Sequence, residues 1–473
     1  MYKDESESVQ STHIDKVILD NKGSDVTEDE IKEFTSNLEL AHVFLENEKY
    51  PEFISCTNII REMIMEKSML LTQIDLYKEV PFYLESLTKC IETRSNSLLI
   101  LSSLICRYEE VIEILKNTNL FEIFSQIFSD NNNNKATSNL FEFIYYILKR
   151  DGSSIKEFMK IDGLGYILHV LSIISFIDEN TSEIIDNIGY TVTVIIDNVP
   201  ISEIEDFLLE CTHCFIHFHK YQVAFYILYY TIVNLGQEGF KKYKEFLIED
   251  VFGSIDWIMN NIGIVIENEE DPVNSQHISP EDLNELKRAI QNGLILTETC
   301  ISNYQFNDYS NMFILDNYIQ IILQFDKVFS KLGMRILSAF IQYNPSVLDD
   351  ILERSTLINE LITFDEKPYF LQEGIISLIF TMFDYMDPNQ YEKFNSSIWE
   401  KIFDYIENCE NIDINSRLIR IISDMVSNGY SIVNFLPYEE IISQMEVNED
   451  TETSREYFLT MYKNDYDYYF GDP

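Results

Sequence analysis

Apolar residues recur along this chain at helical spacing, and the amphipathic stretches that they form repeat about every forty residues. Each stretch is followed, after a short break, by a second and more apolar helix, with no strand pattern between them. Stacked helical repeats give this pattern, because each repeat buries its apolar face on its neighbours. We therefore expect an all-α fold, a right-handed α-solenoid of about eight to nine helical repeats. The amphipathic stretches begin near Val80, Phe121, Leu164, Glu205, Phe252, Met312, Leu357, Ile398 and Pro437.

The junction between two helices of one repeat is clearest between Ser154 and Leu171. A short amphipathic helix ends at Asp162 and Gly163, and we expect the glycine to supply the left-handed turn. A helix rich in Leu and Ile begins directly afterwards. The more apolar helices are predicted at Ser97–Tyr108, Asn139–Arg150, Glu183–Asn198, Gln222–Leu235, Leu286–Asn303, Val328–Tyr343, Gln372–Met386 and Ser416–Asn428.

An apolar segment, a Gly or Asn, and a Leu-rich helix recur in this order, and the order resembles the first two helices of an armadillo repeat. The resemblance covers roughly residues 70–445, and HEAT repeats share the same period. It implies that the more apolar helices are the third helices of armadillo-like repeats and line a concave groove. In armadillo proteins, polar residues on these helices hydrogen-bond the backbone of an extended peptide. Whether the repeats are of the armadillo or the HEAT type stays open.

Composition divides the chain into three parts. Residues 1–26 are rich in Ser, Thr, Asp and Glu and are predicted to form a disordered acidic arm. Thr27 and Glu30 have the spacing of a capping box, so the solenoid is expected to span residues 27–445. Residues 446–473 form an acidic, aromatic C-terminal tail. A closing helix is predicted over Thr453–Lys463, with Tyr457, Phe458, Met461 and Tyr462 facing inward. An acidic insertion at residues 266–282 accounts for the one wide gap between repeats.

Charge limits the partners that this chain can bind. The formal net charge is −46, from 80 acidic and 34 basic residues. Such a surface repels phosphate backbones, so we expect no nucleic-acid partner and no insertion into an anionic membrane. A basic protein or an Arg/Lys-rich segment is the electrostatic complement. The alternative is that the charge only keeps a large apolar scaffold soluble.

The sequence also predicts a compartment. The N-terminal residues are acidic and resemble no signal peptide, and no uncharged apolar run reaches the length of a membrane-spanning helix. The 7 cysteines are scattered without the spacing of a disulfide framework. We expect an intracellular protein, cytoplasmic and/or nuclear.

The segment Cys211–His219 holds three of the 7 histidines. Helical spacing places Glu210, His213 and His217 on one face, where they could hold a divalent metal ion such as zinc. The alternative is a solvated helix face opposite an apolar stripe, and we predict this alternative and no metal. Since the sequence contains no standard catalytic motif either, we predict that the chain is no enzyme and binds no cofactor.

Polar residues stand at matching places near the ends of the third helices: Asn198, Asn234, Gln342, Asp384 and Asp424. By the resemblance, these residues are expected to bind a partner in the groove. Trp257 and Asn261 have the four-residue spacing found in the groove of importin-alpha-type adaptors, but they fall on a second helix. We therefore expect Trp257 in the core.

These features predict a non-enzymatic scaffold that binds a basic protein along the concave face of an acidic solenoid. Two alternatives fit the same sequence: a karyopherin-like transport carrier for basic cargo, and a regulatory subunit of a larger enzyme complex.

Overall fold

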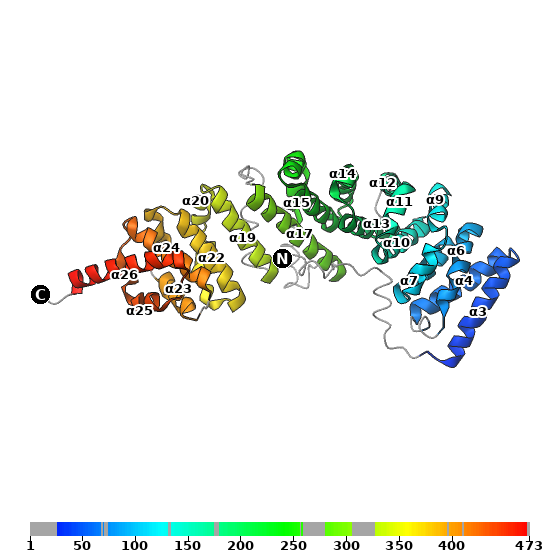
Figure 1. The fold of residues 1–473 in the computed structure, drawn as a ribbon, viewed down its shortest axis with the longest axis horizontal. Coiled ribbons are helices and arrows are strands. Elements are labelled where there is room, and N and C mark those ends of the chain that lie inside the picture. The colour runs from blue at the N-terminus through cyan, green and yellow to red at the C-terminus, as the bar shows by residue number, and fades with distance from the viewer. Residues whose placement is uncertain are drawn as a thin grey trace, which may run out of the picture. The chain divides into compact units, whose positions relative to one another are not determined.

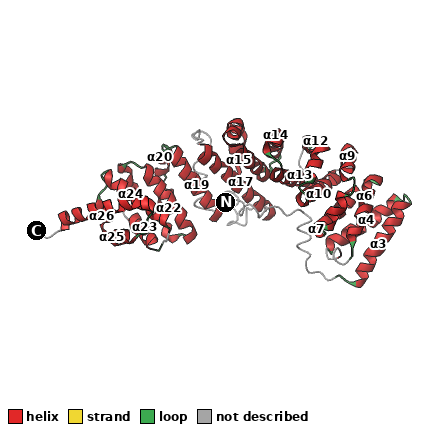
Figure 2. Ribbon diagram, in the orientation of Figure 1, coloured by secondary structure: helices red, strands yellow, loops and turns green. Residues whose placement is uncertain are grey.

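The structure, a computed structural model, describes residues 26–67, 70, 74–130, 134–174, 179–255, 257–258, 280–304, 327–394, 397–408 and 411–470. Every regular element in these ranges is helical, which confirms the all-α prediction (Figure 2). The chain divides into two compact units, Met1–Leu235 and Gly236–Pro473. None of the described helices is long and apolar enough to cross a membrane.

In the first unit, α4, α7, α10 and α13 pack one against the next (Figure 1). Contacts of α6 with α9 and of α12 with α14 form a second row. The helices of this unit are α3 (Glu28–Glu46), α4 (Tyr50–Glu66), η1 (Leu76–Glu79), α6 (Val80–Lys89), η2 (Ile91–Thr93), α7 (Arg94–Arg107), α8 (Glu110–Lys116), α9 (Leu120–Asp130), α10 (Asn134–Arg150), α11 (Ser154–Lys160), α12 (Gly163–Ile173), α13 (Glu179–Asn198), α14 (Ile201–His217) and α15 (Tyr221–Phe246), whose last residues enter the second unit.

In the second unit, α17, α19, α22, α24 and α26 likewise pack in chain order. Shorter helices connect them, as in the first unit. The helices are η3 (Leu247–Val251), α17 (Pro280–Tyr304), α19 (Lys327–Tyr343), α20 (Val347–Leu352), α21 (Ser355–Ile362), η5 (Phe364–Glu366), α22 (Tyr369–Tyr385), η6 (Pro388–Lys393), α23 (Ser397–Glu407), α24 (Ile412–Ser427), η7 (Ile432–Tyr438), α25 (Glu439–Gln444) and α26 (Glu449–Phe470).

The predicted third helices are confirmed as α7, α10, α13, α15, α17, α19, α22 and α24, and we call them the ladder helices. Their boundaries agree with the sequence pattern to within three residues in α7, α19 and α22. The helices α10, α13, α17 and α24 begin four to six residues earlier than the pattern, and α15 extends beyond it. The pattern ends at Leu235, whereas the helix continues to Phe246 through a kink at Gly236, where φ is 63° and ψ is −144°. The kink lies where the two units meet in the sequence.

Buried amides connect successive ladder helices of the first unit. The Asn139 side chain donates to the Ser95 carbonyl at 2.7 Å, and Asn187 donates to the Ser138 carbonyl at 3.2 Å. Asn187 also donates to the Ser138 hydroxyl at 3.1 Å. Because an unpaired amide is costly to bury, these bonds favour one register between neighbouring repeats.

The junction at residue 163 differs from the prediction. The left-handed residue is Asp162, with φ 60°, and Gly163 is already helical. A Cβ on Gly163 would lie 2.4 Å from the ring of Phe158, so this glycine is needed for close packing. Asp162 can take the left-handed conformation because a short polar side chain tolerates it better than most.

The two ends of the array keep most of their predicted features. At the start of α3, Thr27 and Glu30 form the predicted capping box. Near the other end, α26 is longer than the predicted closing helix, and Phe458 is buried as expected. Tyr457, predicted to point inward, is 55% exposed, because the neighbouring residue takes the buried position. The arm at residues 1–25, the insertion at 266–279 and the stretch beginning near Met312 lie outside the described residues.

Candidate protein-interaction surface

The five polar residues predicted to bind a partner all have exposed side chains near the C-terminal ends of ladder helices. In the first unit, Asn198 ends α13, and Asn234 lies two residues before the kink in α15. In the second unit, Gln342, Asp384 and Asp424 lie in the last turn of α19, α22 and α24. Since a helix carries partial negative charge at its C-terminus, each of these positions favours a cation.

The two asparagines of the first unit are partly engaged within their own helices. Asn198 donates to the Val194 carbonyl, and Asn234 donates to the Tyr230 carbonyl, both at 2.8 Å. These bonds use one amide N–H of each side chain, and the amide oxygen remains an acceptor. Each asparagine can therefore accept from the backbone N–H of a bound segment.

Asp384 has a partner that the sequence analysis did not foresee. Arg417 of α24 donates to the Asp384 carboxylate at 2.7 Å and to the Thr381 hydroxyl at 2.9 Å. This ion pair joins α22 to α24 and offsets the charge of Asp384. The acidic contribution of this end of the unit therefore comes mainly from other carboxylates.

Two further aspartates lie on elements that meet at Tyr391 of η6. Asp387 is the N-cap of η6. The Tyr391 ring lies 5.6 Å between centroids from Tyr430, which follows the helix of Asp424. The pKa of the Tyr391 hydroxyl is raised first by burial and then by three nearby acidic side chains, those of Asp424, Asp387 and Asp384. Asp387 and Asp424 are both exposed. We call these three aspartates the unit 2 acidic cluster. One arginine, Arg417, pairs within it, so the cluster keeps a net negative charge.

A second surface of the first unit was missed by the sequence analysis. Tyr226 and Tyr230 of α15 lie 4.6 Å apart between ring centroids, with ring planes at 43°. The Tyr226 hydroxyl donates to the Asp197 carboxylate of α13 at 3.4 Å. Tyr190 is half-buried and lies two turns before Asp197 on α13. We call Tyr190, Asp197, Tyr226 and Tyr230 the tyrosine–aspartate patch. The i, i+4 spacing of the α15 tyrosines was the available sequence signal.

Burial raises the pKa of Tyr226 well above its ordinary value. The Tyr230 hydroxyl and the Asp197 carboxylate raise that pKa further. The phenol is therefore a protonated donor at neutral pH, and the carboxylate beside it carries the charge of the patch.

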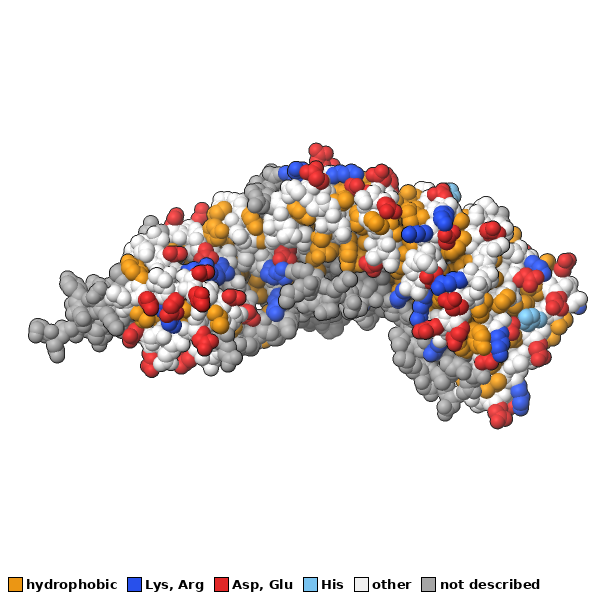
Figure 3. Space-filling view, in the orientation of Figure 1, with side chains coloured by type: hydrophobic (Ala, Val, Ile, Leu, Met, Phe, Trp, Pro, Cys, Tyr) orange, Lys and Arg blue, Asp and Glu red, His pale blue; other side chains and the backbone are white. Residues whose placement is uncertain are grey.

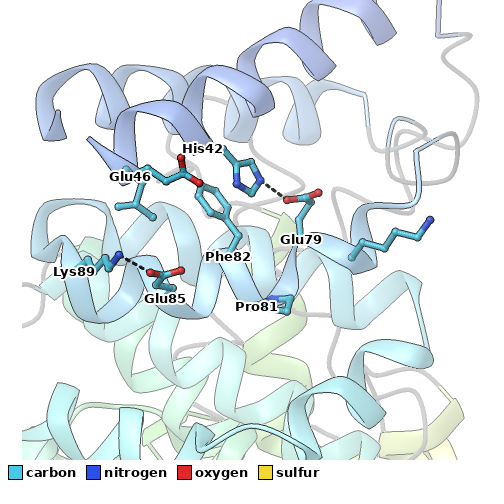
Figure 4. Close-up of a pocket in the computed structure, with 9 residues that line it drawn as sticks. His42, Glu46, Glu79, Pro81, Phe82, Glu85 and Lys89 are labelled. Atoms are coloured by element: carbon cyan, nitrogen blue, oxygen red, sulfur yellow. Dashed lines mark hydrogen bonds and ion pairs between the residues drawn. The ribbon is translucent and has the colours of Figure 1, made fainter. Parts of the chain in front are cut away.

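A pocket of about 330 Å³ lies between α3 and α6, close to the start of the described chain (Figure 4). The His42 ring stacks on Phe82 with centroids 3.8 Å apart, and its Nε2 lies 2.6 Å from Glu79 Oε2. Lys89 pairs with Glu85 at 2.5 Å on the opposite side of the lining. Glu46 and Lys78 also line the pocket, so its wall carries side chains of both signs.

The histidine-rich helix α14 divides as the pattern predicted. Cys211 and Phe215 are buried, whereas Glu210, His213 and His217 are exposed. Within the residues that the structure describes, no three Asp, Glu, His or Cys side chains are grouped so as to hold a metal ion.

Trp257 was predicted to lie in the core, and this prediction is wrong. Its side chain is 52% exposed, while Ile255 and Ile258 beside it are buried. Ile255 and Ile258 are three residues apart and share the buried face of the helix. Asn261, which follows Trp257 by four residues, lies outside the described residues.

Acidic and basic side chains are interspersed on the face shown in Figure 3, and both units carry acidic residues there. Over the second unit, Asp and Glu are frequent around α23, α24 and α26. On this face the charge is spread rather than gathered in one place, so we expect local clusters to determine where a cation binds.

No family model matches this chain, and no curated protein is similar to it in sequence. Solved structures are similar in fold. A structure of Kap95p with RanGDP superimposes with a TM-score of 0.55 at 12% identity, over 95% of this chain and 57% of Kap95p. The chain has the fold of an armadillo/HEAT-like helical-repeat solenoid. It spans just over half of the length of Kap95p.

Two further structures match with lower scores. An engineered protein gives a TM-score of 0.48 at 10% identity, over 96% of this chain and 99% of its own. Kap121p bound to Pho4p gives 0.39 at 12% identity, over 90% of this chain and 46% of its own.

Proposed function

We propose that this chain is a non-enzymatic scaffold that binds a basic protein segment along the C-terminal ends of its ladder helices. The observation that carries the proposal is the unit 2 acidic cluster, which coincides with two of the five predicted binding positions, Asp384 and Asp424. The exposed asparagines of the first unit occupy the matching place on α13 and α15. Binding positions thus recur from repeat to repeat.

The recurrence suits an extended segment. A segment that contacts several helix ends gains affinity from many weak contacts. Once one contact has formed, the effective concentration of the next binding group is raised. The negative potential of the helix ends attracts a basic segment from a distance and favours it over neutral ones. Within the first unit, Asn198 and Asn234 add hydrogen bonds to the backbone of a bound segment, and within the second unit Gln342 does so.

The test removes charge from the cluster without changing the shape of the side chains. In the full chain, Asp387→Asn with Asp424→Asn is compared with Glu400→Gln and Asp404→Asn, two exposed acids of α23 outside the ladder helices. The probe is a fluorescent ten-residue lysine-rich peptide, and fluorescence anisotropy gives its Kd. We expect the cluster variant to bind about tenfold more weakly and the control pair to change Kd by less than about twofold.

An equal loss of affinity in both variants would contradict the proposal, because it would mean that only the total charge matters.

A transport carrier for basic cargo is the second candidate, supported by the similarity to Kap95p over most of this chain. Kap95p is described in complex with RanGDP. A carrier of this kind would act in the cytoplasm and the nucleus and would release cargo when a Ran-class GTPase binds. If GTP-loaded Ran leaves the lysine-rich peptide bound to the full chain, the carrier function is excluded and the scaffold remains.

A further inference from the structure

The tyrosine–aspartate patch has a geometry that a general attraction for positive charge does not require. Tyr190 and Asp197 are seven residues apart on α13, and Tyr226 and Tyr230 are four apart on α15, so each pair shares one helix face. Gly189 brings the two helices close, since a Cβ on it would lie 3.0 Å from a methyl carbon of Val223. The Asp197 carboxylate of α13 and the Tyr226 ring of α15 therefore meet, with Tyr230 beside Tyr226.

This combination matches the guanidinium group. A guanidinium is planar, stacks on aromatic rings and forms paired hydrogen bonds with a carboxylate, whereas an ammonium is compact and strongly hydrated. The two rings of α15, 4.6 Å apart, offer a face for stacking, and Asp197 lies within hydrogen-bond reach of one of their hydroxyls. The Tyr226 hydroxyl holds the carboxylate in place beside the rings.

On one side of the patch, the preceding ladder helix α10 already supplies a cation. Lys149 of α10 donates to the Tyr145 hydroxyl at 2.8 Å, and its Nζ lies 5.0 Å from the centroid of that ring. Tyr145 in turn lies 5.8 Å from Tyr190 between ring centroids. The chain therefore places its own cation against a tyrosine beside the patch, and a second cation is favoured only on the α13 and α15 side, next to Asp197.

We propose that the tyrosine–aspartate patch is a subsite for an arginine side chain of the basic segment, with the guanidinium against Tyr226 and Tyr230 and bonded to Asp197. The subsite rests on the proposed function and adds a preference for arginine over lysine. The occupant that it commits to is a basic segment of a partner protein, because the patch and the surrounding chain are acidic.

The experiment measures that preference with two peptides of equal charge and a third that carries one positive charge less. Three capped, fluorescent five-residue peptides are compared on the full chain: four lysines with a central arginine, five lysines, and four lysines with a central citrulline. We expect the arginine peptide to bind about tenfold more tightly than the five-lysine peptide. The citrulline peptide, which keeps the planar shape without the charge, should bind most weakly.

Variants test whether the preference for arginine over lysine depends on the residues of the patch. Asp197→Asn, an exposed change, and Tyr226→Leu with Tyr230→Leu should each abolish the advantage of arginine over lysine. Glu203→Gln on α14 and Tyr457→Leu on α26 remove an exposed acid and an exposed tyrosine elsewhere, and should preserve it. If the tyrosine pair fails to fold by circular dichroism, Asp197→Asn decides alone.

Equal affinity for the arginine and lysine peptides in the native chain would overturn the subsite. If both peptides then bind far more tightly than an uncharged peptide, the proposed function survives this result. If neither binds above the uncharged peptide, the proposed function falls together with the subsite. Tighter binding of an acidic peptide would also overturn both.

Discussion

Individual polar side chains set the contacts between repeats in the first unit. Asn187 is 5% exposed, and its side-chain amide donates to Ser138 of the preceding ladder helix. Asn139 donates to Ser95 in the same way. The carboxylate of Glu30 has a comparable role at the start of the array, where it caps α3 and pairs with Lys67. The predictions at this scale concern single residues whose partners are known.

Truncating a buried amide should cost more than truncating an exposed one. Asn187→Ala removes the buried hydrogen bonds to the carbonyl and the hydroxyl of Ser138 and opens a small void, so we expect a loss of about 2 kcal/mol in the free energy of unfolding. Asn198→Ala removes an exposed amide of the same helix and should cost under about 0.5 kcal/mol. Urea denaturation followed by circular dichroism compares them. Similar losses would show that the inter-repeat bonds contribute little.

The ion pair of Glu30 predicts its titration. The hydrogen bond from Lys67, followed by the bonds with Thr27, lowers the pKa of the Glu30 carboxyl to about 2. Because the pKa of Glu30 is lower in the folded than in the unfolded chain, the ionised carboxylate stabilises the fold. This stabilisation is complete above about pH 4.5 and is lost as the pH falls towards 2. NMR titration of the carboxyl carbon should give that low midpoint, and Lys67→Met should raise it. An ordinary midpoint in the native chain would contradict the pairing.

At the scale of helices, the sequence predicted the ladder helices well because each carries a long and strongly periodic apolar pattern. The capping box at Thr27 was also predictable, since its geometry is local. The predictions that were wrong concern residues whose surroundings depend on tertiary packing. Gly163 is small because Phe158 lies against it, and the exposure of Trp257 depends on which neighbours reach that helix face. Neither fact is encoded in local spacing.

The candidate surface was predicted in part. Exposure of the five polar positions followed from amphipathicity, but the pairing of Asp384 with Arg417 joins residues 33 apart on different helices. The tyrosine–aspartate patch joins α13 to α15 in the same way, through Asp197 and Tyr226. Contacts between helices depend on the packing of repeats, which no local pattern specifies.

The kink in α15 gives a prediction about a single helix. Gly236 has a φ of 63° and no atom near its missing Cβ, so Gly236→Ala adds backbone strain without a clash. We expect a loss of about 1 kcal/mol in stability, or straightening of the helix. Gly253 also has open space but lies in an ordinary helix, so Gly253→Ala should be neutral or stabilising. Urea denaturation and far-UV circular dichroism distinguish these outcomes.

At the scale of the whole chain, the helical-repeat fold carries a net charge of −46. We expect this charge to favour basic partners over acidic ones. On the face shown in Figure 3 the acidic side chains are spread rather than gathered in one place, so attraction alone would be weakly specific. We propose that the acidic cluster and the tyrosine–aspartate patch add local specificity at the ends of ladder helices. The central claim is therefore that these ends, and not the overall charge, hold a basic segment.

The most direct measurement is the salt dependence of binding between the full chain and the lysine-rich peptide. We predict that the logarithm of Kd rises linearly with the logarithm of salt concentration, and that the slope becomes clearly shallower in the Asp387→Asn, Asp424→Asn variant. The Glu400→Gln, Asp404→Asn variant should keep the native slope. A slope that falls equally in both variants would contradict the account, because the peptide would then be held by the overall charge alone.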